Sequence, residues 1–371
     1  MRVLHVVATG QRRGAEMFAS DLVRALDRAG GYEQEVAVLR DPWPPAVRYE
    51  ARVVRMPASG RSVPILRIDR GTLTSIRRRI ELFRPDVVHA HGAEAFKYLA
   101  VGAPSNVPIV YRRIGTAPRS ITRGMRRLAH AALLRRSDRV VAVAESVRRE
   151  TIETFGVPDG RVVTIPRGVD PERLAPRRGR TEVRTELGVS RSAPVAVTVG
   201  ALSPEKDPIA HLEVFRALRR SWNDLVYLFV GDGPLRRELD EAICDQALEP
   251  GVRVLGTRSD VGDLLEASDV LVLASRTEGM PGCVIEAGMA GVPAVAFGVA
   301  GVPEVVVDGV TGYVVPPGDH DRLAERVSHL LADPSRREEM GRAAREHYRG
   351  AYDITGIADR YVGVYAEVVG P

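Results

Sequence analysis

The stretch VLVLASRTEGMPGCVIEAGMA, Val270–Ala290, shows which kind of fold this chain adopts. It begins with a run of Val and Leu, Val270–Leu273, that has the length and composition of a strand buried on both faces. A tight loop containing Gly279 and Pro281 follows, and a helical pattern starts near Gly282. A buried strand, a glycine-containing loop and a helix in this order are the repeating unit of an open parallel sheet.

The same alternation of strands and helices continues on both sides of this stretch. In the first half, strands are predicted at Val3–Val7, Val36–Leu39, Val53–Met56, Val87–Ala90, Ile109–Tyr111, Val140–Val143 and Val162–Ile165, and helices at Ala15–Arg28 and Leu73–Phe83. In the second half, further strands are predicted at Val195–Val199, Val226–Val230, Val252–Leu255 and Ala294–Ala296, and helices at Ile209–Arg220, Leu235–Gln246, Val261–Ala267 and Val284–Ala290. The end of the chain is predicted to be helical over Arg322–Ala332, Ser335–Arg349 and Ile357–Val368.

A proline-rich segment, Pro166–Pro176, separates the two series and is interpreted as a linker. We therefore predict an α/β chain with two Rossmann-like, doubly wound parallel sheets facing a central cleft. The first domain is expected to span residues 1–168, with the C-terminal helix 353–371 packing back on it. The second is expected to span 169–352. Ligands bind beyond the carboxyl ends of the strands in such sheets, so the site is expected there.

Composition restricts the class of protein. The chain of 371 residues has two cysteines, Cys244 and Cys283, and no Cys-x-x-Cys pair, which argues against a disulfide framework and a thiolate metal site. The apolar start MRVLHVVATG is too short for a signal peptide, and no apolar run approaches the roughly 18 residues that a membrane span needs. We expect a cytoplasmic protein, with peripheral contact at the inner face of the membrane left open.

The net charge of +5 comes with arginines that crowd part of the first half. These are Arg112, Arg113, Arg119, Arg123, Arg126, Arg127, Arg135 and Arg136. They form either a solvated face or a surface that attracts an anionic partner such as a membrane or a phosphorylated acceptor; no nucleic-acid partner is expected. Ile121, Met125, Leu128 and Ala132 form an apolar stripe beside them, and we favour packing of this stripe on the sheet over contact with lipid.

Two glutamates in the Val270–Ala290 stretch are candidates for chemistry. Glu278 lies in the loop and Glu286 lies one to two turns inside an otherwise apolar helix, where a carboxylate needs partners such as sugar hydroxyls. The free backbone N–H groups of Gly279–Cys283 at the helix start suit a phosphate. The alternative, equally open from spacing alone, is that Glu278 caps the helix and Glu286 pairs with an arginine.

Three more loops follow predicted strands and are candidates for anion binding. Lys206 ends the loop that begins at Gly200, and a lysine there can reach a diphosphate. Gly231–Pro234 would let a ligand approach the backbone closely. In the first half, Gly14 precedes a helix start, which is also favourable for an anion. The alternatives are an exposed loop lysine at Lys206 and a plain turn before a helix at Gly231–Pro234.

Other patterns are weaker or missing. His89 and His91 face the same side of a strand but make a poor metal site by themselves, and we place His91 at the cleft. Asp319 and Asp321 have the Asp-x-Asp form that some sugar-transfer enzymes use for a metal, but a helix N-cap is favoured here. The sequence contains no G-x-G-x-x-G after a strand, no P-loop and no G-x-S-x-G.

These segments together resemble the retaining glycosyltransferases of family 4, whose GT-B fold has two Rossmann-like domains. The resemblance covers essentially the whole chain and is strongest over Val197–Asp319. There TVGALSPEKD, FVGDGPL, VLGTRSDVGDLLEASDVLVLASRTEGMPGCVIEAGMAGVPAVA, AGVPEVV and DGVTGYVVPPGD occur in the family's order. In the first half, VLHVVATG, PDVVHAHG and IPRGVD are also similar to the family.

The resemblance implies roles for individual residues. Glu278 and Glu286 match the family's E-x7-E motif, so Glu278 is expected to face the transferred sugar and Glu286 the ribose. Lys206 matches the lysine that neutralises the diphosphate. The other expected donor-binding positions are Gly14, Gly200, Gly231, Arg258, Gly279, Met280, Pro281 and Gly282.

Two departures from the family pattern concern positive charge. Ala201 stands where the family usually has an arginine, and Tyr111–Gly115 lacks the family's histidine. Our hypothesis is that Arg112 or Arg113 supplies the missing charge from the opposite domain, which makes these two, with Glu278 and His91, the expected catalytic set.

The resemblance implies a retaining transfer of a hexose-type sugar without a metal or other cofactor, from a UDP-sugar first and a GDP-sugar second. The acceptor is a small molecule, a lipid-linked saccharide or a polysaccharide. The alternatives are a nucleotide-sugar 2-epimerase and a catalytically inactive nucleotide-sugar-binding protein on the same fold.

Overall fold

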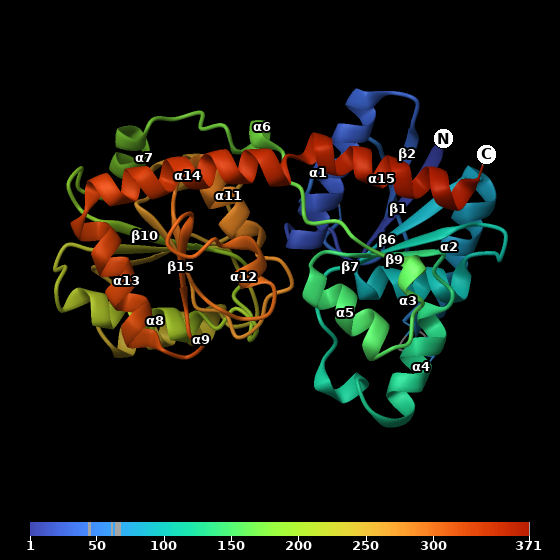
Figure 1. Ribbon diagram of the computed structural model, residues 1–371, viewed down its shortest axis with the longest axis horizontal. Coiled ribbons are helices and arrows are strands. Elements are labelled where there is room, and N and C mark those ends of the chain that lie inside the picture. The colour runs from blue at the N-terminus through green and yellow to red at the C-terminus, as the bar shows by residue number, and fades with distance from the viewer. Residues whose placement is uncertain (44–45, 61, 64–67, 371) are drawn as a thin grey trace. The chain divides into compact units, whose positions relative to one another are not determined.

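The computed structural model describes residues 1–43, 46–60, 62–63 and 68–370 (Figure 1). The chain divides into two compact units: unit 1 is Met1–Gly168 with Ile354–Pro371, and unit 2 is Val169–Asp353. Each unit contains a parallel sheet with helices packed against it, which confirms the predicted fold class. The terminal helix α15 (Ile354–Val369) belongs to unit 1, although it follows unit 2 in the sequence.

In its described residues, unit 1 has a seven-stranded parallel sheet in the order β3-β2-β1-β6-β7-β8-β9. The strands are β1 (Arg2–Val7), β2 (Glu33–Val38), β3 (Arg52–Arg55), β6 (Val87–His91), β7 (Ile109–Arg113), β8 (Arg139–Ala142) and β9 (Val162–Thr164). A separate antiparallel pair is formed by β4 (Ser62–Val63) and β5 (Ile68–Asp69).

Helices cover both faces of this sheet because alternate residues of the strands are buried in opposite directions. On one face, Val3 of β1 packs with Phe18 of α1 and Tyr361 of α15. On the other, the Phe96 ring of α3 stacks on Tyr111 of β7, with the ring centroids 4.1 Å apart. The helices of unit 1 include α1 (Gly14–Ala29), α2 (Arg70–Phe83), α3 (Ala93–Gly102), α4 (Gly124–Leu134) and α5 (Glu145–Glu153), with short 3₁₀ turns η1 (Arg119–Ile121) and η2 (Asp159–Arg161).

Unit 2, all of whose residues are described, has a six-stranded parallel sheet in the order β12-β11-β10-β13-β14-β15. The strands are β10 (Val195–Val199), β11 (Val226–Val230), β12 (Val252–Val254), β13 (Val270–Leu273), β14 (Ala294–Phe297) and β15 (Gly312–Val315). The helices are α6 (Pro171–Leu174), α7 (Arg180–Glu186), α8 (Pro208–Arg219), α9 (Arg236–Asp245), α10 (Val261–Glu266), α11 (Gly282–Ala290), α12 (Val302–Val305), α13 (His320–Ala332) and α14 (Pro334–Tyr352).

The strand order of unit 2 reverses between β10 and β13. The chain runs outward from β10 to β12 on one side, and from β13 to β15 on the other. The loops that follow β10 and β13 therefore leave neighbouring strands at the same edge of the sheet. In open α/β sheets this reversal point is the usual ligand site.

All twelve predicted strands are present, with ends shifted by up to a few residues. The structure adds the two-residue strands β4 and β5, and β15, whose GYVV sequence is short and starts with glycine, so it lacked a clear strand signal. The predicted linker Pro166–Pro176 contains a helical turn, α6, and is therefore not entirely irregular. No described helix is both long enough and apolar enough to cross a bilayer.

The prediction that the apolar stripe of α4 covers the sheet is wrong. Among the described side chains of α4, only Leu134 at its end is fully buried. Met125 is 80% exposed and Leu128 is 52% exposed. α4 packs mainly against η1 and α3, because α3 and α5 lie against the strands of that region. The stripe therefore remains on the surface of unit 1.

Candidate functional site

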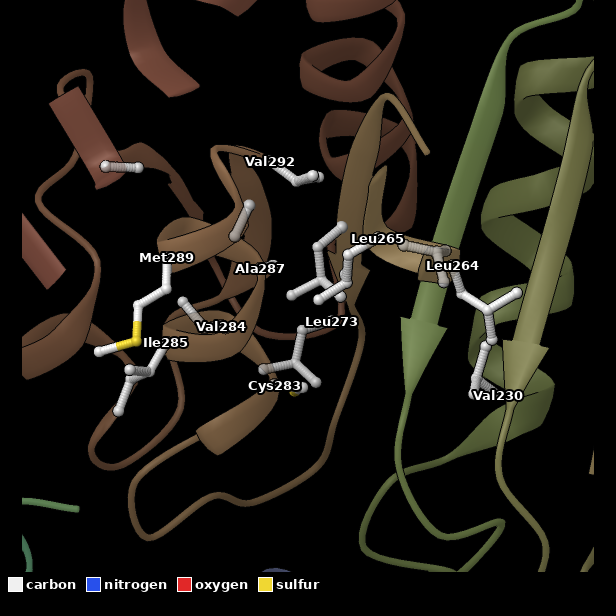
Figure 2. Close-up of a cluster of buried hydrophobic side chains, with 14 of the residues drawn as sticks. Val230, Leu264, Leu265, Leu273, Cys283, Val284, Ile285, Ala287, Met289 and Val292 are labelled. Atoms are coloured by element: carbon white, nitrogen blue, oxygen red, sulfur yellow. The ribbon is translucent and has the colours of Figure 1, made fainter. Parts of the chain in front are cut away.

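Helix α11, which carries Glu286, is held firmly in the core of unit 2. Figure 2 shows the apolar side chains of α11 packed with Leu273 of β13 and Leu265 of α10. Gly288 permits this packing, because a Cβ there would lie 1.9 Å from the Tyr348 ring of α14. Eight of the nine residues of α11 are buried, so the start of the helix has a fixed position.

Glu278, in the loop between β13 and α11, is bound by groups from two loops. The Lys206 ammonium donates to its Oε1 at 2.5 Å, and the Ser275 hydroxyl donates to the same oxygen at 2.7 Å. Glu278 is buried, whereas the side chain of Lys206 is 28% exposed. The residues predicted to contact the sugar and the diphosphate are thus brought into direct contact, with the lysine side chain partly exposed.

Glu286 does pair with an arginine, as one of the two open interpretations held. Arg173 of α6 donates from Nη2 to Glu286 Oε1 at 3.0 Å, and both side chains are largely buried. Glu278, by contrast, does not cap the helix: the N-cap position of α11 is Pro281, and no side chain caps it. The role of Glu286 toward a ribose stays a prediction.

Sequence reasoning missed Arg173 because it treated its segment as a linker. A signal was present in the dipeptide Asp170-Pro171. Aspartate at an N-cap and proline at the first helical position are typical of a helix start. The Asp170 carboxylate indeed accepts the Glu172 backbone N–H at 3.0 Å.

The backbones of three loops meet at the same edge of the sheet. The Gly231 N–H donates to the Gly256 carbonyl at 2.8 Å, and a Cβ on Gly231 would lie 1.8 Å from the Gly200 carbonyl oxygen. A Cβ on Gly233 would lie 2.4 Å from the Leu202 carbonyl oxygen. These glycines are required because the main chains approach too closely for any side chain.

The N-terminus of α11 is well suited to bind an anion at this edge of the sheet. Gly279, Met280, Pro281 and Gly282 form the turn into the helix, and the Glu278 carbonyl accepts the Gly301 N–H at 3.3 Å. Because no side chain forms a capping hydrogen bond at the N-terminus of α11, the positive end of the helix dipole is available to a ligand.

Arg258 is held by carboxylates rather than left open to a ligand. Its Nε donates to Asp260 Oδ1 at 2.8 Å, and its Nη2 donates to Glu186 Oε1 at 3.1 Å. The hydrogen bond to Asp260 raises the pKa of Arg258 above its usual range. Its place beside the nucleotide stays a prediction.

In unit 1, His91 lies in a buried histidine cluster with His5 and His89. Register explains the grouping: His5 is opposite His89 on the neighbouring strand, and His91 follows two residues later on the same face. The His5 Nδ1 and His91 Nε2 atoms are 3.1 Å apart, and the His89 and His91 ring centroids 4.0 Å. Burial lowers the pKa of His5 to about 4 and those of His89 and His91 well below their usual value.

This histidine cluster is the one group of metal-ligating side chains found in the described part of the chain. One ligand atom of each histidine lies within 4.8 Å of the others. The set is entirely neutral and includes no carboxylate, and the nearby charge of Arg112 disfavours further positive charge on His89. A buried divalent ion there would lack a counter-charge, so the residues do not fit a metal well.

Arg112 and Arg113 end strand β7 and point to opposite faces. Arg113 forms an ion pair with Glu150 and donates to Thr151 Oγ1 at 3.0 Å. The Arg112 guanidinium carbon lies 3.8 Å from the Phe18 ring centroid. Both are buried, and whether either supplies charge to a diphosphate stays a prediction. In unit 2, the favoured role of Asp319 is confirmed: it caps α13 by accepting the Arg322 N–H at 3.0 Å.

Comparison with known proteins decides the family. The family model described as Glycosyltransferase Family 4 matches residues 12–173, and that described as Glycosyl transferases group 1 matches residues 179–347. A GDP-mannose-dependent alpha-(1-6)-phosphatidylinositol monomannoside mannosyltransferase from Mycolicibacterium smegmatis is 30% identical over 361 residues, covering 89% of this chain and 87% of that protein. The chain belongs to glycosyltransferase family 4.

Two further proteins match over nearly their whole length. Alpha-D-kanosaminyltransferase from Streptomyces kanamyceticus is 27% identical, covering 94% of this chain and 99% of that protein. The crystal structure of Anabaena HepE in complex with UDP and glucose superposes with a TM-score of 0.85 at 21% identity, covering 99% of this chain and 100% of that one. The two Rossmann-like units thus have the GT-B fold, and the protein is a glycosyltransferase that uses a nucleotide sugar.

Proposed function

We propose that this family 4 glycosyltransferase is retaining and metal-independent and moves a hexose from a UDP-sugar to an acceptor hydroxyl. The observation that carries the proposal is the Lys206–Glu278 pair, at the edge of the unit 2 sheet and beside the uncapped start of α11. In the unliganded enzyme the ammonium neutralises Glu278. When donor binds, Lys206 turns to the diphosphate and Glu278 accepts hydrogen bonds from the sugar hydroxyls.

Charge on the leaving nucleoside diphosphate has to be stabilised in the transition state. Lys206 and the N-terminus of α11 provide preorganised positive potential for that purpose, which is the support for a metal-independent reaction. Addition of EDTA should leave activity unchanged if this is right. Loss of activity with EDTA and recovery with Mg²⁺ would contradict it.

The proposed retaining transfer uses no glutamate nucleophile. Arg173 binds Glu286, and Glu278, once Lys206 has turned to the diphosphate, is occupied by the sugar hydroxyls. We propose same-face attack: the acceptor oxygen bonds to the anomeric carbon as the bond from that carbon to the diphosphate breaks. The acceptor proton passes to the leaving phosphate oxygen. A product of inverted anomeric configuration would rule this path out.

UDP is the proposed donor nucleotide because it occurs with two of the similar proteins. HepE, which shares the fold, was crystallised with UDP, and an Escherichia coli relative, 26% identical over 86% of this chain, is a UDP-Gal-dependent galactosyltransferase. GDP is second, because the Mycolicibacterium relative is GDP-mannose-dependent. Ligand that binds the native state raises its melting temperature, so we would compare stabilisation by UDP, GDP, ADP and dTDP.

Glu286→Ala provides the control for that experiment. Stabilisation of the wild type by UDP, lost in Glu286→Ala, supports the donor site in unit 2. Stabilisation by GDP alone would replace UDP with GDP in the proposal. If no nucleotide stabilises the wild type, or the variant responds equally, the enzyme's donor site is not the one proposed here.

We also propose that α4 makes peripheral contact with an anionic membrane. Its exposed side chains Met125 and Leu128 lie near Arg126 of the same helix and Arg123 at the N-cap, both exposed and without an ion-pair partner among the described residues. An apolar face flanked by arginines is the pattern of a helix that lies in the headgroup region of an anionic bilayer.

A further inference from the structure

Glu278 is held by a buried hydroxyl group from its own loop. Ser275 follows strand β13, is 1% exposed, and donates to Glu278 Oε1 at 2.7 Å. The same oxygen accepts the ammonium of Lys206 at 2.5 Å, but that side chain comes from another loop and is 28% exposed. The serine lies three residues before Glu278 and is buried, so its hydroxyl cannot leave the carboxylate unless the loop rearranges.

The two donors therefore behave differently when a nucleotide sugar binds. In the proposed function, Lys206 turns to the diphosphate, and the hydrogen bond from Ser275 to Oε1 remains. The other carboxylate oxygen of Glu278, Oε2, accepts no hydrogen bond from the described part of the chain, so it is the oxygen available to the sugar hydroxyls. The serine hydroxyl thus fixes the orientation of the carboxylate once the lysine no longer does.

The peptide that precedes Ser275 is fixed by a histidine. His211 lies on α8, is 2% exposed, and its Nε2 accepts the backbone N–H of Ala274 at 3.3 Å. A backbone N–H can only donate, so Nε2 carries no proton and the ring proton is on Nδ1, which lies 2.7 Å from the Tyr227 hydroxyl. Burial lowers the pKa of His211 to about 3, so the ring accepts this hydrogen bond at neutral pH.

Backbone hydrogen bonds keep the two loops in place independently of the Lys206 side chain. The Arg276 N–H donates to the Glu205 carbonyl at 2.8 Å, which joins the loop of Glu278 to the loop of Lys206. The Glu278 carbonyl accepts the Gly301 N–H at 3.3 Å. When the ammonium leaves the carboxylate, the main chains therefore stay joined, and the orientation of the glutamate side chain then depends on the serine.

We propose that Ser275 and His211 are positioning residues of the transfer reaction. Ser275 holds Oε1 of Glu278 after Lys206 has turned to the diphosphate, and His211 fixes the peptide from which the serine extends. This inference rests on the proposed function, in which Glu278 accepts hydrogen bonds from the sugar. Both residues act through Glu278, so their loss should slow the reaction of the sugar without weakening the binding of the nucleotide.

The test measures release of UDP from UDP-glucose or UDP-galactose, whichever the wild-type full-length enzyme hydrolyses faster, without added acceptor. Ser275→Ala should lower kcat roughly 10- to 100-fold, the loss expected for a hydrogen bond to a charged group. Its dissociation constant for UDP, measured by calorimetry, should equal that of the wild type, because Ser275 acts through Glu278 and UDP carries no sugar to be transferred. Ser275→Thr retains a hydroxyl and should recover most of the lost kcat.

Ser268→Ala is the matched control. The Ser268 hydroxyl is also buried and donates to the Leu264 carbonyl at 2.7 Å, so the substitution removes the same group at the same hydrogen-bond length and should leave kcat unchanged. His211→Leu removes the acceptor for the Ala274 N–H and should also lower kcat. His211→Gln, whose amide oxygen can accept that N–H, should lose less. If His211→Leu does not fold, Ser275→Ala still decides the inference.

The outcomes separate this inference from the proposed function. A kcat of Ser275→Ala equal to that of the wild type overturns the inference, and so does a fall in kcat matched by loss of UDP affinity, since that shows a merely structural role. Wild-type kcat in Glu278→Ala would instead show that the glutamate has no part in transfer, which is a failure of the proposed function. Loss of kcat in both Glu278→Ala and Ser275→Ala, with UDP affinity retained, supports the inference.

Discussion

The ammonium of Lys206 lies 2.5 Å from the carboxylate of Glu278, although 72 residues separate them in the chain. The contact exists because β10 and β13 are neighbours in the sheet, so the loops that leave them meet at one edge. The residue expected on the diphosphate and the residue expected on the sugar therefore neutralise each other before the donor arrives. In the proposed donor complex, each of the two side chains exchanges one partner for another, so neither charge has to be desolvated without a partner.

Lys206→Ala should lower kcat by about 10²- to 10³-fold, the scale for loss of one preorganised electrostatic group in the transition state. The measurement is steady-state transfer from the UDP-sugar. Lys97→Ala removes the lysine of a comparable ion pair, Lys97–Glu94 on α3, and should leave kcat unchanged. Equal activity of Lys206→Ala and the wild type would show that the lysine does not act on the leaving group.

Arg173→Ala should destabilise the enzyme by about 3 kcal/mol, because it removes the cation bound to a largely buried Glu286 carboxylate. Urea denaturation followed by circular dichroism provides the measurement. Arg236→Ala breaks the more exposed Arg236–Asp240 pair on α9 and should cost about 0.5 kcal/mol or less. A similar small loss in both variants would mean that the Arg173–Glu286 pair is unimportant for stability.

Gly231→Ala should destabilise unit 2 and abolish donor binding, because its Cβ would lie 1.8 Å from the Gly200 carbonyl oxygen and the backbone cannot move aside cheaply. Gly363→Ala is the matched control: it lies in α15 with open space around it, and should stabilise the protein by about 0.5–1 kcal/mol through helix propensity. Thermal denaturation with and without UDP separates the two effects. Normal melting of Gly231→Ala would contradict the close loop packing.

Stability should fall as the pH drops below about 6.5, because the folded state keeps His5, His89 and His91 neutral. Their folded-state pKa values are lowered, so the unfolded chain binds protons between the unfolded value near 6.5 and the folded value, about 4 for His5. Each such histidine contributes a loss of up to about 1.4 kcal/mol per pH unit within that window. Glu16 has the opposite effect. Burial raises its pKa in the folded state to about 7, so the folded state favours the protonated carboxyl, and this contribution to stability is lost as the pH rises through that value.

Urea denaturation between pH 7.5 and 5 measures this dependence. His5→Gln should reduce the slope of unfolding free energy against pH by the contribution of one histidine. His347→Gln, at an exposed position, should keep the wild-type slope. An unchanged slope in His5→Gln would mean that His5 is protonated in the folded enzyme.

Replacement of both Met125 and Leu128 by serine should abolish co-sedimentation with phosphatidylglycerol vesicles, because the exposed apolar face of α4 would no longer enter the headgroup region. Phosphatidylcholine vesicles should bind the wild type weakly, since they lack the negative charge that attracts the arginines. Leu82→Ser, which removes an exposed leucine from α2, is the control. Equal vesicle binding by the serine variant and the wild type would exclude α4 as the contact.

The sequence by itself determined the order of strands and helices, because runs of Val and Ile between glycine loops are buried on both faces only in a parallel sheet. It also made Glu278, Glu286 and Lys206 candidate site residues, since their motifs are local and follow strand ends. Local signals could likewise have located α6, through Asp170-Pro171. These features depend on residues that are close together in the sequence, so local residue patterns are enough to predict them.

Only the tertiary structure decided which charges are neutralised. Nothing in the sequence distinguishes Arg112 from Arg113. In the structure, Arg113 forms an ion pair with Glu150, whereas Arg112 has no carboxylate partner among the described residues. The pairing of Arg173 with Glu286 spans 113 residues, and the exposure of Met125 depends on how α3 and α5 pack. Charge pairing and surface exposure arise from contacts between distant segments, so they appear only when the sheets have assembled.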